Sequence, residues 1–481
     1  MNRRLITMTT ALAVGLTTAT AAPIAVAQEA SANTDATDII ISPGSDETQI
    51  NLAWRTSSLN PSAEFVQWAP SAAIVDGAFP KDASTSEATR RLGGAADYHN
   101  AATITGLKEN TEYSYRLGSD ERGWSQVHTF DTESFGDDWN FLFVGDPQVG
   151  ASGNRDKDTE GWLAATKAAT AQFPDSSLLH SGGDQVNIAV SRNEYTSFFS
   201  NPTLRELPTS VVRGNHEKGG SLYDRMYNMP NGSNDNYWYE HNNALFVSLD
   251  SNNSDIEAHK TFLRETISAH GADKDWIILS FHHAPYSQGT HHDDGNLTPL
   301  REELAPTISE LGVDAVLSGH DHIYTRSHLM NGNEPVLPTE GATGAERAGK
   351  PGDVLHPKKG EALYITGSSS SGSKFYDFMA KDGTRIKDAT VEDTFAQDQP
   401  LDSTAWWNQD RTPDYTNIQV TPEKLTLTTY NVADNSVVDE VTLAKGASDE
   451  PEQDDSSSEG SDVLAGSDDL SSGSSSDLFL R

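Results

Sequence analysis

One pattern dominates the sequence from Asp138 onward: short apolar runs, each followed at once by polar residues. The runs are WNFLFVGD, DSSLLHSGGD, TSVVRGNHE, ALFVSLDS, DWIILSFHH and VDAVLSGHDH. Runs that are apolar at nearly every position are typical of strands covered on both faces of a sheet. Stretches with helical patterning lie between them, notably residues 160–172, 256–270 and 300–311. The alternation predicts a layered α/β domain with a buried sheet.

A different pattern precedes this domain, over residues 36–134. Its short segments are rich in β-branched and aromatic residues and are separated by turns: IIIS, TQINLAW, AEFVQWA, AATITGL, EYSYRLG and QVHTFDT. They predict an all-β sandwich, with Trp54 in the core between the two sheets. The segment TGLKENTEYSYR resembles the fibronectin type III pattern, which implies that Tyr113 bonds back to the backbone. The final stretch, TNIQVTPEKLTLTTYNVADNSVVDEVTLAK, predicts antiparallel strands that join the α/β domain.

The ends of the chain have compositions of their own. Arg3 and Arg4, an apolar run and the small residues AVA that end at position 27 predict a signal peptide, 1–27, and hence secretion to the extracellular space. No later run reaches 18 apolar residues, so we expect no membrane span. Residues 447–481 are mostly serine, aspartate, glycine and glutamate, which predicts a disordered tail.

Charge and cysteine content exclude several functions. The chain of 481 residues has 34 basic and 71 acidic side chains, a formal net charge of −37, so it repels nucleic acid and anionic membranes. It has no cysteine, which excludes disulfides, thiolate metal ligands and cysteine nucleophiles. The length allows two or three domains, and the oligomeric state stays open.

Polar side chains gather at five strand ends. In open α/β sheets, ligands bind where the strands end. Four of these ends place glycine just before the first polar residue, which predicts sharp turns. If strand geometry continues past Gly319, His320 and His322 share one face, because residues two apart in a strand do so. The strand ends therefore predict a metal or phosphate site built from Asp146, Asp184, Asn215, His216, His282, His283, His320 and His322.

The order of these motifs resembles that of the calcineurin-like metallophosphoesterases. The matching segments are GDPQ (145–148), GDQVN (183–187), GNHE (214–217), FHH (281–283) and GHDH (319–322), and the resemblance covers about residues 138–445. With the sandwich in front, the chain resembles the purple acid phosphatase branch or its bacterial relatives. The resemblance implies an N-terminal sandwich, 36–134, followed by a catalytic domain of αββα type, 138–445.

The resemblance also implies two metal ions, divalent or of mixed valence. Asp184 would bridge them, and Asn215, His282 and His320 would complete the site of one metal. Asp146 and His322 would serve the other. The family pattern favours His282 over His283, because Tyr286 lies four residues beyond His282. Oxygen and imidazole ligands suit Fe, Zn or Mn, and the metal identities stay open.

Two positions depart from the family pattern. Gln148 stands where other members carry histidine, and Asn187 stands where purple acid phosphatases carry the tyrosine that binds ferric iron. The loss of that tyrosine predicts a colourless protein. Either amide oxygen would then be a ligand of the metal that Asp146 serves, and we include Gln148 in the expected ligand set.

Three further histidines complete the expected site. The resemblance implies that His216 contacts the phosphoryl group and that His291 or His292 protonates the leaving oxygen. The implied function is hydrolysis of a small phosphate monoester, in the manner of an acid phosphatase, by a hydroxide that both metals hold. Phosphodiesterase activity of the same fold is one alternative. A secreted adhesin or binding protein with a degenerate metal site is another, although its retained Asp184, Asn215, His282, His320 and His322 speak against decay.

Overall fold

The computed structural model describes residues 35–56, 62–93, 97–233 and 235–446. The expected signal peptide, 1–27, and the expected tail, 447–481, lie outside the described residues. Among the helices of the described part, none is long and apolar enough to cross a membrane.

An all-β sandwich begins the described chain. One sheet consists, in spatial order, of β1 (Ala36–Pro43), β2 (Gln49–Thr56), β6 (Tyr98–Thr105) and β5 (Thr89–Leu92). The other consists of β4 (Ser84–Glu87), β3 (Phe65–Pro70), β7 (Thr111–Ser119) and β8 (Gly123–Trp124), with β9 (His128–Thr132) also paired to β7. Trp54 is buried between the sheets, as the sequence predicts. The Tyr113 hydroxyl accepts a hydrogen bond from the Lys108 amide at 3.0 Å, so the expected bond from the tyrosine to the backbone is present.

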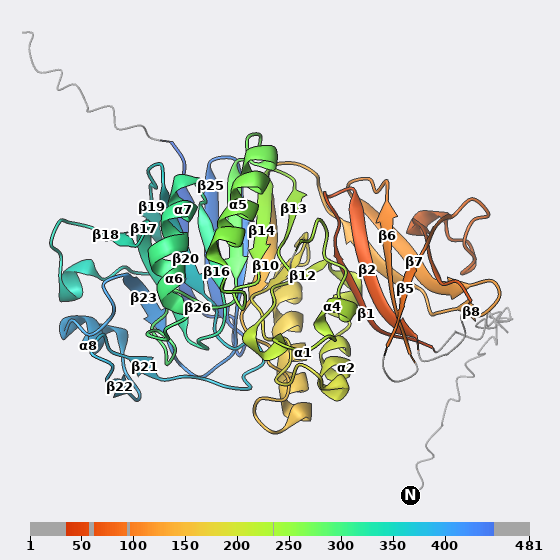
Figure 1. Cartoon of the computed structure of the whole chain (residues 1–481). Helices are drawn as coiled ribbons and strands as arrows, with labels where there is room; N and C mark the ends of the chain where they lie inside the picture. Colours follow the sequence, from red (N-terminus) through yellow and green to blue (C-terminus); the bar gives the residue numbers. More distant parts are fainter. Residues whose placement is uncertain (1–34, 57–61, 94–96, 234, 447–481) are drawn as a thin grey trace, which may run out of the picture. The chain divides into compact units, whose positions relative to one another are not determined.

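Two larger sheets follow in the second part of the chain (Figure 1). The first consists of β12 (Thr209–Val211), β11 (Leu179–Ser181), β10 (Trp139–Val144), β24 (Asp414–Val420), β25 (Lys424–Asn431), β26 (Val437–Ala444) and β19 (Asp353–Leu355). The second consists of β13 (Tyr237–His241), β14 (Ala244–Leu249), β15 (Trp276–Phe281), β16 (Ala315–Ser318), β20 (Glu361–Thr366), β17 (Tyr324–Asn331) and β18 (Glu334–Val336), with β23 (Thr404–Asn408) on β17. A short pair, β21 (Phe378–Met379) and β22 (Arg385–Ile386), stands apart.

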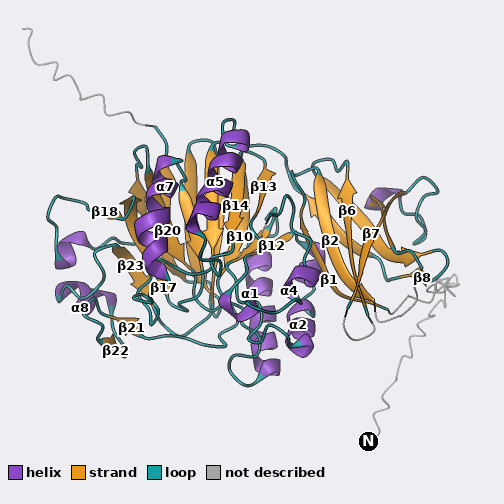
Figure 2. Cartoon of the chain, viewed as in Figure 1, coloured by secondary structure: helices purple, strands orange, loops and turns teal. Residues whose placement is uncertain are grey.

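Helices cover the outer faces of both sheets, which gives the expected αββα layering (Figure 2). One core, which includes Phe141, Ile418, Phe246 and Leu317, lies between the sheets. The first sheet packs outward on α1 (Arg155–Gln172), α2 (Arg192–Phe199), α3 (Thr203–Glu206) and α4 (Tyr223–Met226). The second packs on α5 (Ile256–His270), α6 (Leu297–Pro299), a π-helical turn (Leu300–Leu304) and α7 (Ala305–Glu310), and α8 (Val391–Ala396) lies in a later loop region. The layers confirm the fold class.

The C-terminal strands complete the first sheet, as the sequence predicts. Strand β10 pairs in parallel with β11 on one side and antiparallel with β24 on the other. Strands β14, β15, β16 and β20 of the second sheet run parallel to one another. Parallel strands carry their functional residues at the carboxyl edge, so the loops after β10, β11, β12, β15 and β16 are the ones that form the site.

Candidate functional site

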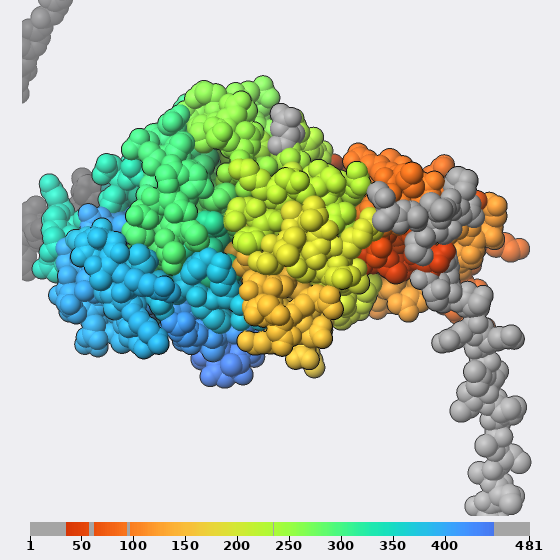
Figure 3. All heavy atoms as spheres, turned by 60° about the horizontal axis from the view of Figure 1, so that its bottom comes forward, coloured from red at the N-terminus to blue at the C-terminus, as the bar shows by residue number. Residues whose placement is uncertain are grey.

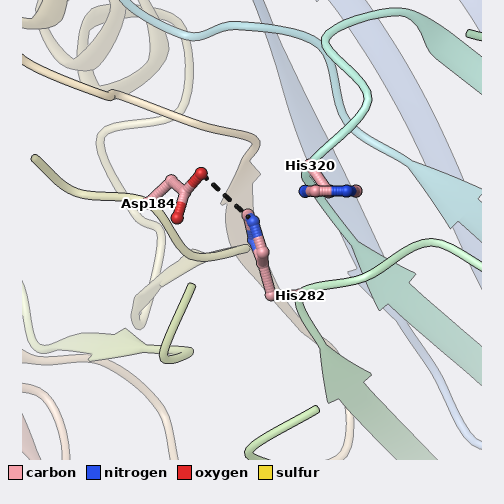
Figure 4. Close-up of side chains that lie close together, drawn as sticks. All are labelled: Asp184, His282 and His320. Carbon is pink, nitrogen blue, oxygen red and sulfur yellow. Dashed lines mark ion pairs between the residues drawn. The ribbon is translucent and has the colours of Figure 1, made fainter. Parts of the chain in front are cut away.

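Four side chains from the two sheets converge at these strand ends. Asp184 follows β11, Asn215 follows β12, His282 follows β15 and His320 follows β16. The Asn215 Oδ1 atom lies 3.0 Å from His282 Nε2 and 2.9 Å from His320 Nδ1. The Asp184 Oδ2 atom lies 3.2 Å from His282 Nε2, the ion pair drawn in Figure 4. The structure thus brings these four expected ligands together, and Asp184, His282 and His320 form a group able to hold a metal ion.

A carboxylate and an imidazole lie beside this group. Asp146, after β10, is fully buried, and its Oδ2 atom lies 3.1 Å from His322 Nε2. The backbone amide of His320 donates to both Asp146 oxygens, at 2.9 Å and 3.0 Å. This contact links the second pair, Asp146 and His322, to the first group. Six of the eight residues expected from the strand ends therefore face one region.

The backbone orients two of the histidines for metal binding. The Nδ1 atom of His282 lies 2.9 Å from the carbonyl of Gly182, and that of His322 lies 2.9 Å from the carbonyl of Lys374. A carbonyl can only accept, so each Nδ1 carries a proton and each Nε2 faces a carboxylate. This arrangement is common around metal-bound histidines. The imidazole, amide and carboxylate donors match the expected metals, so the residues fit a two-metal centre.

Negative charge in the site already attracts a positive charge. Burial alone would lower the pKa of His282, but the carboxylates of Asp184 and Asp146 outweigh burial and raise it to about 10. Burial would raise the pKa of Asp184, yet His282 and His216 lower it to about 2. The electrostatics therefore favour a cation between these buried groups, which is what a metal ion supplies.

The glycines of the motifs provide space more than they provide turns. A Cβ atom on Gly214 would lie 2.0 Å from Asp184 Oδ1, and one on Gly319 would lie 2.1 Å from Asp146 Oδ1. Of the motif glycines only Gly183 has a positive φ, 112°, and the left-handed backbone also occurs at the functional residues, with φ of 47° at Asp184, 75° at His320 and 44° at His322. Such values are uncommon outside glycine and often mark functional sites.

These angles correct one expectation from the sequence. Strand geometry does not continue past Gly319, because β16 ends at Ser318 and β17 begins at Tyr324. His320 and His322 reach the same region through two left-handed residues, and they meet different partners there.

Gln148 and Asn187 occupy the edge of the site near Asp146. The Gln148 amide donates to Asn187 Oδ1 at 3.3 Å, and the buried Gln148 Oε1 has no hydrogen-bond partner among the described residues. A buried oxygen without a hydrogen-bond partner is suited to serve as a metal ligand. The backbone carbonyl of Asn187 faces His216 Nδ1 at 2.6 Å, which turns His216 Nε2 toward Asp184 Oδ2, 3.9 Å away.

The histidine pair 291–292 is divided by the structure. The His291 ring lies 4.5 Å from the His320 ring, and its Nδ1 atom is 2.8 Å from Asp294 Oδ2. His292 is buried, and its Nδ1 atom faces the Gly289 carbonyl at 3.1 Å. Within the contacts of the described residues, only His291 of the pair meets the cluster. His283 also borders the cluster, with its ring 4.6 Å from the His320 ring, while its Nδ1 atom lies 2.7 Å from Ser251 Oγ.

Several supporting residues were not identified from the sequence. The Tyr376 hydroxyl lies 3.2 Å from His291 Nε2. Asp321 is buried and accepts from the backbone amides of His291 and Gly289 at 2.9 Å and 3.1 Å. Glu217 accepts from the amides of Gly214 and Val186 at 2.9 Å and 3.2 Å, and it thereby ties together the loops that carry Asn215 and Asp184. The GNHE and GHDH motifs could have suggested Glu217 and Asp321, whereas nothing near Tyr376 marked it.

A serine-rich loop supports the site from the other side. The Ser370 amide donates to the Asp146 carbonyl at 3.1 Å, and the Ser371 hydroxyl donates to the Pro147 carbonyl. Burial and, to a smaller extent, the charge of Asp184 raise the pKa of Glu217 to about 8. In the space-filling view, the segments coloured yellow, green and cyan, which carry the loops of the site, adjoin on one face (Figure 3).

Comparisons with known proteins agree with this geometry. A family model for the N-terminal domain of purple acid phosphatases matches residues 36–132, and one for calcineurin-like phosphoesterases matches residues 140–324. The solved structure of a purple acid phosphatase from yellow lupin (Lupinus luteus) seeds shares the fold, with a TM-score of 0.63 and 16% identity. That likeness covers 85% of this chain and 74% of the lupin chain.

Curated relatives are more distant and cover only part of the chain. A probable inactive purple acid phosphatase of Arabidopsis thaliana is 22% identical over 48% of this chain and 43% of its own length. An uncharacterized protein of Mycobacterium tuberculosis is 24% identical over 48% of this chain and 51% of its own length. The chain thus spans about half the length of these relatives. The two family models, the order of the motifs and the shared fold lead to one conclusion: the chain belongs to the calcineurin-like phosphoesterases, in the purple acid phosphatase-like branch.

Proposed function

We propose that this protein is a phosphomonoesterase with two metal ions, related in mechanism to acid phosphatases. The observation that carries the proposal is the convergence of Asp184, Asn215, His282 and His320 on one point, with the Asp146–His322 pair beside it. The proposed catalytic domain is 138–445, preceded by the sandwich domain 36–134. Export by means of the signal peptide expected at 1–27 is part of the proposal.

Each candidate ligand has a proposed role. Asp184, whose carboxylate contacts His282, would bridge the ions. Asn215, His282 and His320 would hold one ion, and Asp146, His322 and Gln148 would hold the other. When bound, such a pair of ions acidifies a water molecule and neutralises charge on the phosphoryl oxygens. The donor set admits Fe, Zn or Mn.

The remaining histidines would act on the substrate. His216 is held at Nδ1 by the Asn187 carbonyl, so its Nε2 is free to donate to a phosphoryl oxygen above Asp184. His291 is held at Nδ1 by Asp294, which leaves Nε2 on the side of Tyr376 to protonate the departing oxygen. His292 is buried and turned away, so we assign the proton donor to His291 alone.

Replacement of Asp184 tests the proposal. We expect Asp184→Ala to lower hydrolysis of an aryl phosphate monoester by at least about 10²-fold and to reduce the bound metal, because both ions lose their shared ligand. Elemental analysis of the purified protein and a panel of monoesters and diesters provide the measurement. Asp156→Ala is the matched control, because Asp156 is an exposed carboxylate at the start of α1. An Asp184→Ala protein with wild-type metal content and turnover would sink the two-metal proposal.

A further inference from the structure

Lys374 stands next to the candidate site, and the proposed reaction gives it no role. Its backbone carbonyl accepts a hydrogen bond from His322 Nδ1 at 2.9 Å, so Lys374 helps to orient the imidazole of a candidate ligand. Its ammonium lies 4.6 Å from the centre of the Tyr376 ring. The Tyr376 ring in turn meets the His322 ring at 5.3 Å and the His291 ring at 5.1 Å, both edge to face. Lys374 therefore lies on the side of the site where His291 faces the leaving group.

The segment that carries Lys374 is held firmly in place. Upstream, Ser370 and Ser371 bond to the carbonyls of Asp146 and Pro147. Downstream, the Gln409 amide donates to the carbonyls of Tyr376 and His322 at 2.7 Å and 2.8 Å. Such anchoring on both sides fixes the backbone from which the ammonium extends, so less backbone entropy is lost when it binds an anion.

Among the described residues, no carboxylate forms an ion pair with the ammonium of Lys374. The lysines that form ion pairs in the described part of the chain are Lys260, Lys274, Lys381 and Lys445. The nearest acidic residue in sequence, Asp377, is taken by Arg385 at 2.8 Å and by Arg411. In a chain with 71 acidic and 34 basic residues, a half-buried lysine without a carboxylate stands out. The contact that its ammonium makes within the described chain is with the ring of Tyr376, a weak interaction.

We propose that Lys374 binds a second anionic group, one carried by the part of the substrate that leaves. The site would then favour phosphoesters and phosphoanhydrides whose leaving group bears a phosphate or a carboxylate, over those with a neutral leaving group. This inference rests on the proposed function, and it names a substrate class for the same site. Lys374 is a specificity residue in this scheme, because its charge meets a group that does not react.

Matched substrates separate this role from a structural one. Phenyl phosphate and 4-carboxyphenyl phosphate differ by one carboxylate, and pyrophosphate supplies a phosphate leaving group. We expect Lys374→Met to raise KM for 4-carboxyphenyl phosphate or pyrophosphate roughly 3- to 10-fold with kcat unchanged, because the lost contact is the same in ground and transition states. Phenyl phosphate should keep its KM and kcat. The two anionic substrates distinguish a carboxylate from a phosphate as the group that is bound.

Three controls make the result decisive. Methionine keeps most of the length of the side chain without its charge, and the backbone bond to His322 does not depend on the side chain. Lys374→Arg should restore the preference, and Lys359→Met should change nothing, because Lys359 is an exposed lysine just before β20. Equal losses for phenyl and carboxyphenyl phosphate, or no loss for any anionic substrate, would overturn the inference.

Failure of the proposed function gives a different result. If the metal-loaded wild-type protein hydrolyses none of the three substrates, the phosphomonoesterase proposal fails. The role of Lys374 is then decided by calorimetric binding of pyrophosphate to wild type and to Lys374→Met. Weaker binding by the variant supports the inference, and equal affinity overturns it.

Discussion

Replacement of Gly214 by alanine tests whether activity and metal binding depend on the position of Asp184. The backbone of Gly214 has φ of −88° and ψ of 175°, values that alanine adopts without strain. The new methyl group would nevertheless lie 2.0 Å from Asp184 Oδ1 and 2.3 Å from the Asp184 amide nitrogen. Real Cβ atoms stay about 3.0 Å or more from such neighbours. Because backbone is involved, rotation of the carboxylate alone does not relieve the clash, and Asp184 must shift by about 1 Å.

A shift of this size is large for a catalytic centre. Misplacement by about 1 Å can slow a reaction about 10²-fold. We therefore expect Gly214→Ala to lower turnover of an aryl phosphate at least about 10²-fold and to lower the bound metal, while the protein stays folded. Elemental analysis, steady-state kinetics and circular dichroism provide the three measurements.

The chain offers a matched control for this substitution. A Cβ atom on Gly295 would meet nothing within 4 Å, and Gly295 does not adopt a left-handed φ. Gly295→Ala should therefore keep the metal content and turnover of wild type. If Gly214→Ala behaves like Gly295→Ala, the position of Asp184 is not critical and the steric reasoning is refuted.

Two further results are expected. His291→Ala should slow hydrolysis of an alkyl phosphate much more than that of nitrophenyl phosphate, by up to about 10²-fold in the ratio, because only the alkoxide needs a proton to leave; equal slowing of both would remove His291 as the acid. The free energy of unfolding should decrease as the pH is lowered below about 6.5. Burial lowers the pKa of His180 and of His241 to about 3 in the folded state, so the unfolded chain binds more protons in this range. Each residue contributes up to about 1.4 kcal/mol per pH unit between about 6.5 and 3, and urea midpoints for wild type and His180→Gln measure it: a variant with an unchanged pH slope contradicts the assignment.

Helix prediction from the sequence succeeded where the helix ends carry clear signals. The predicted helix 256–270 coincides with α5, which Asp255 caps at its first turn and Gly271 follows. The predicted helix 160–172 begins too late, since α1 starts at Arg155. Its first turn is highly charged and gives no apolar periodicity, whereas the Asn154 side chain accepts from the Lys157 amide and starts the helix. Local capping thus determined a boundary that hydrophobic pattern did not show.

The residues of the candidate site also fall into those that the sequence could predict and those that it could not. Residues that directly follow apolar strands could be found from the sequence, because strand ends of a parallel sheet meet at one edge. Tyr376 and Lys374 could not, because they lie in a serine- and glycine-rich segment that resembles an ordinary loop. Their place at the site depends on hydrogen bonds from that loop to Asp146 and His322, which are contacts distant in sequence. The roles of His291 and Lys374 stay predictions until they are measured.

The pairing of β10 with β24 has a consequence for how a newly made chain acquires its metals. Strand β10 precedes every candidate ligand, but its partner β24 (Asp414–Val420) follows all of them. Until β24 is synthesised, β10 has one open edge, and the core between the sheets lacks Ile418, Val420, Leu425 and Leu427. An open edge beside an incomplete core invites aggregation or proteolysis. We therefore expect metal loading to wait for the last strands, so that a chain cut short before residue 414 carries all its candidate ligands yet lacks three strands of the first sheet.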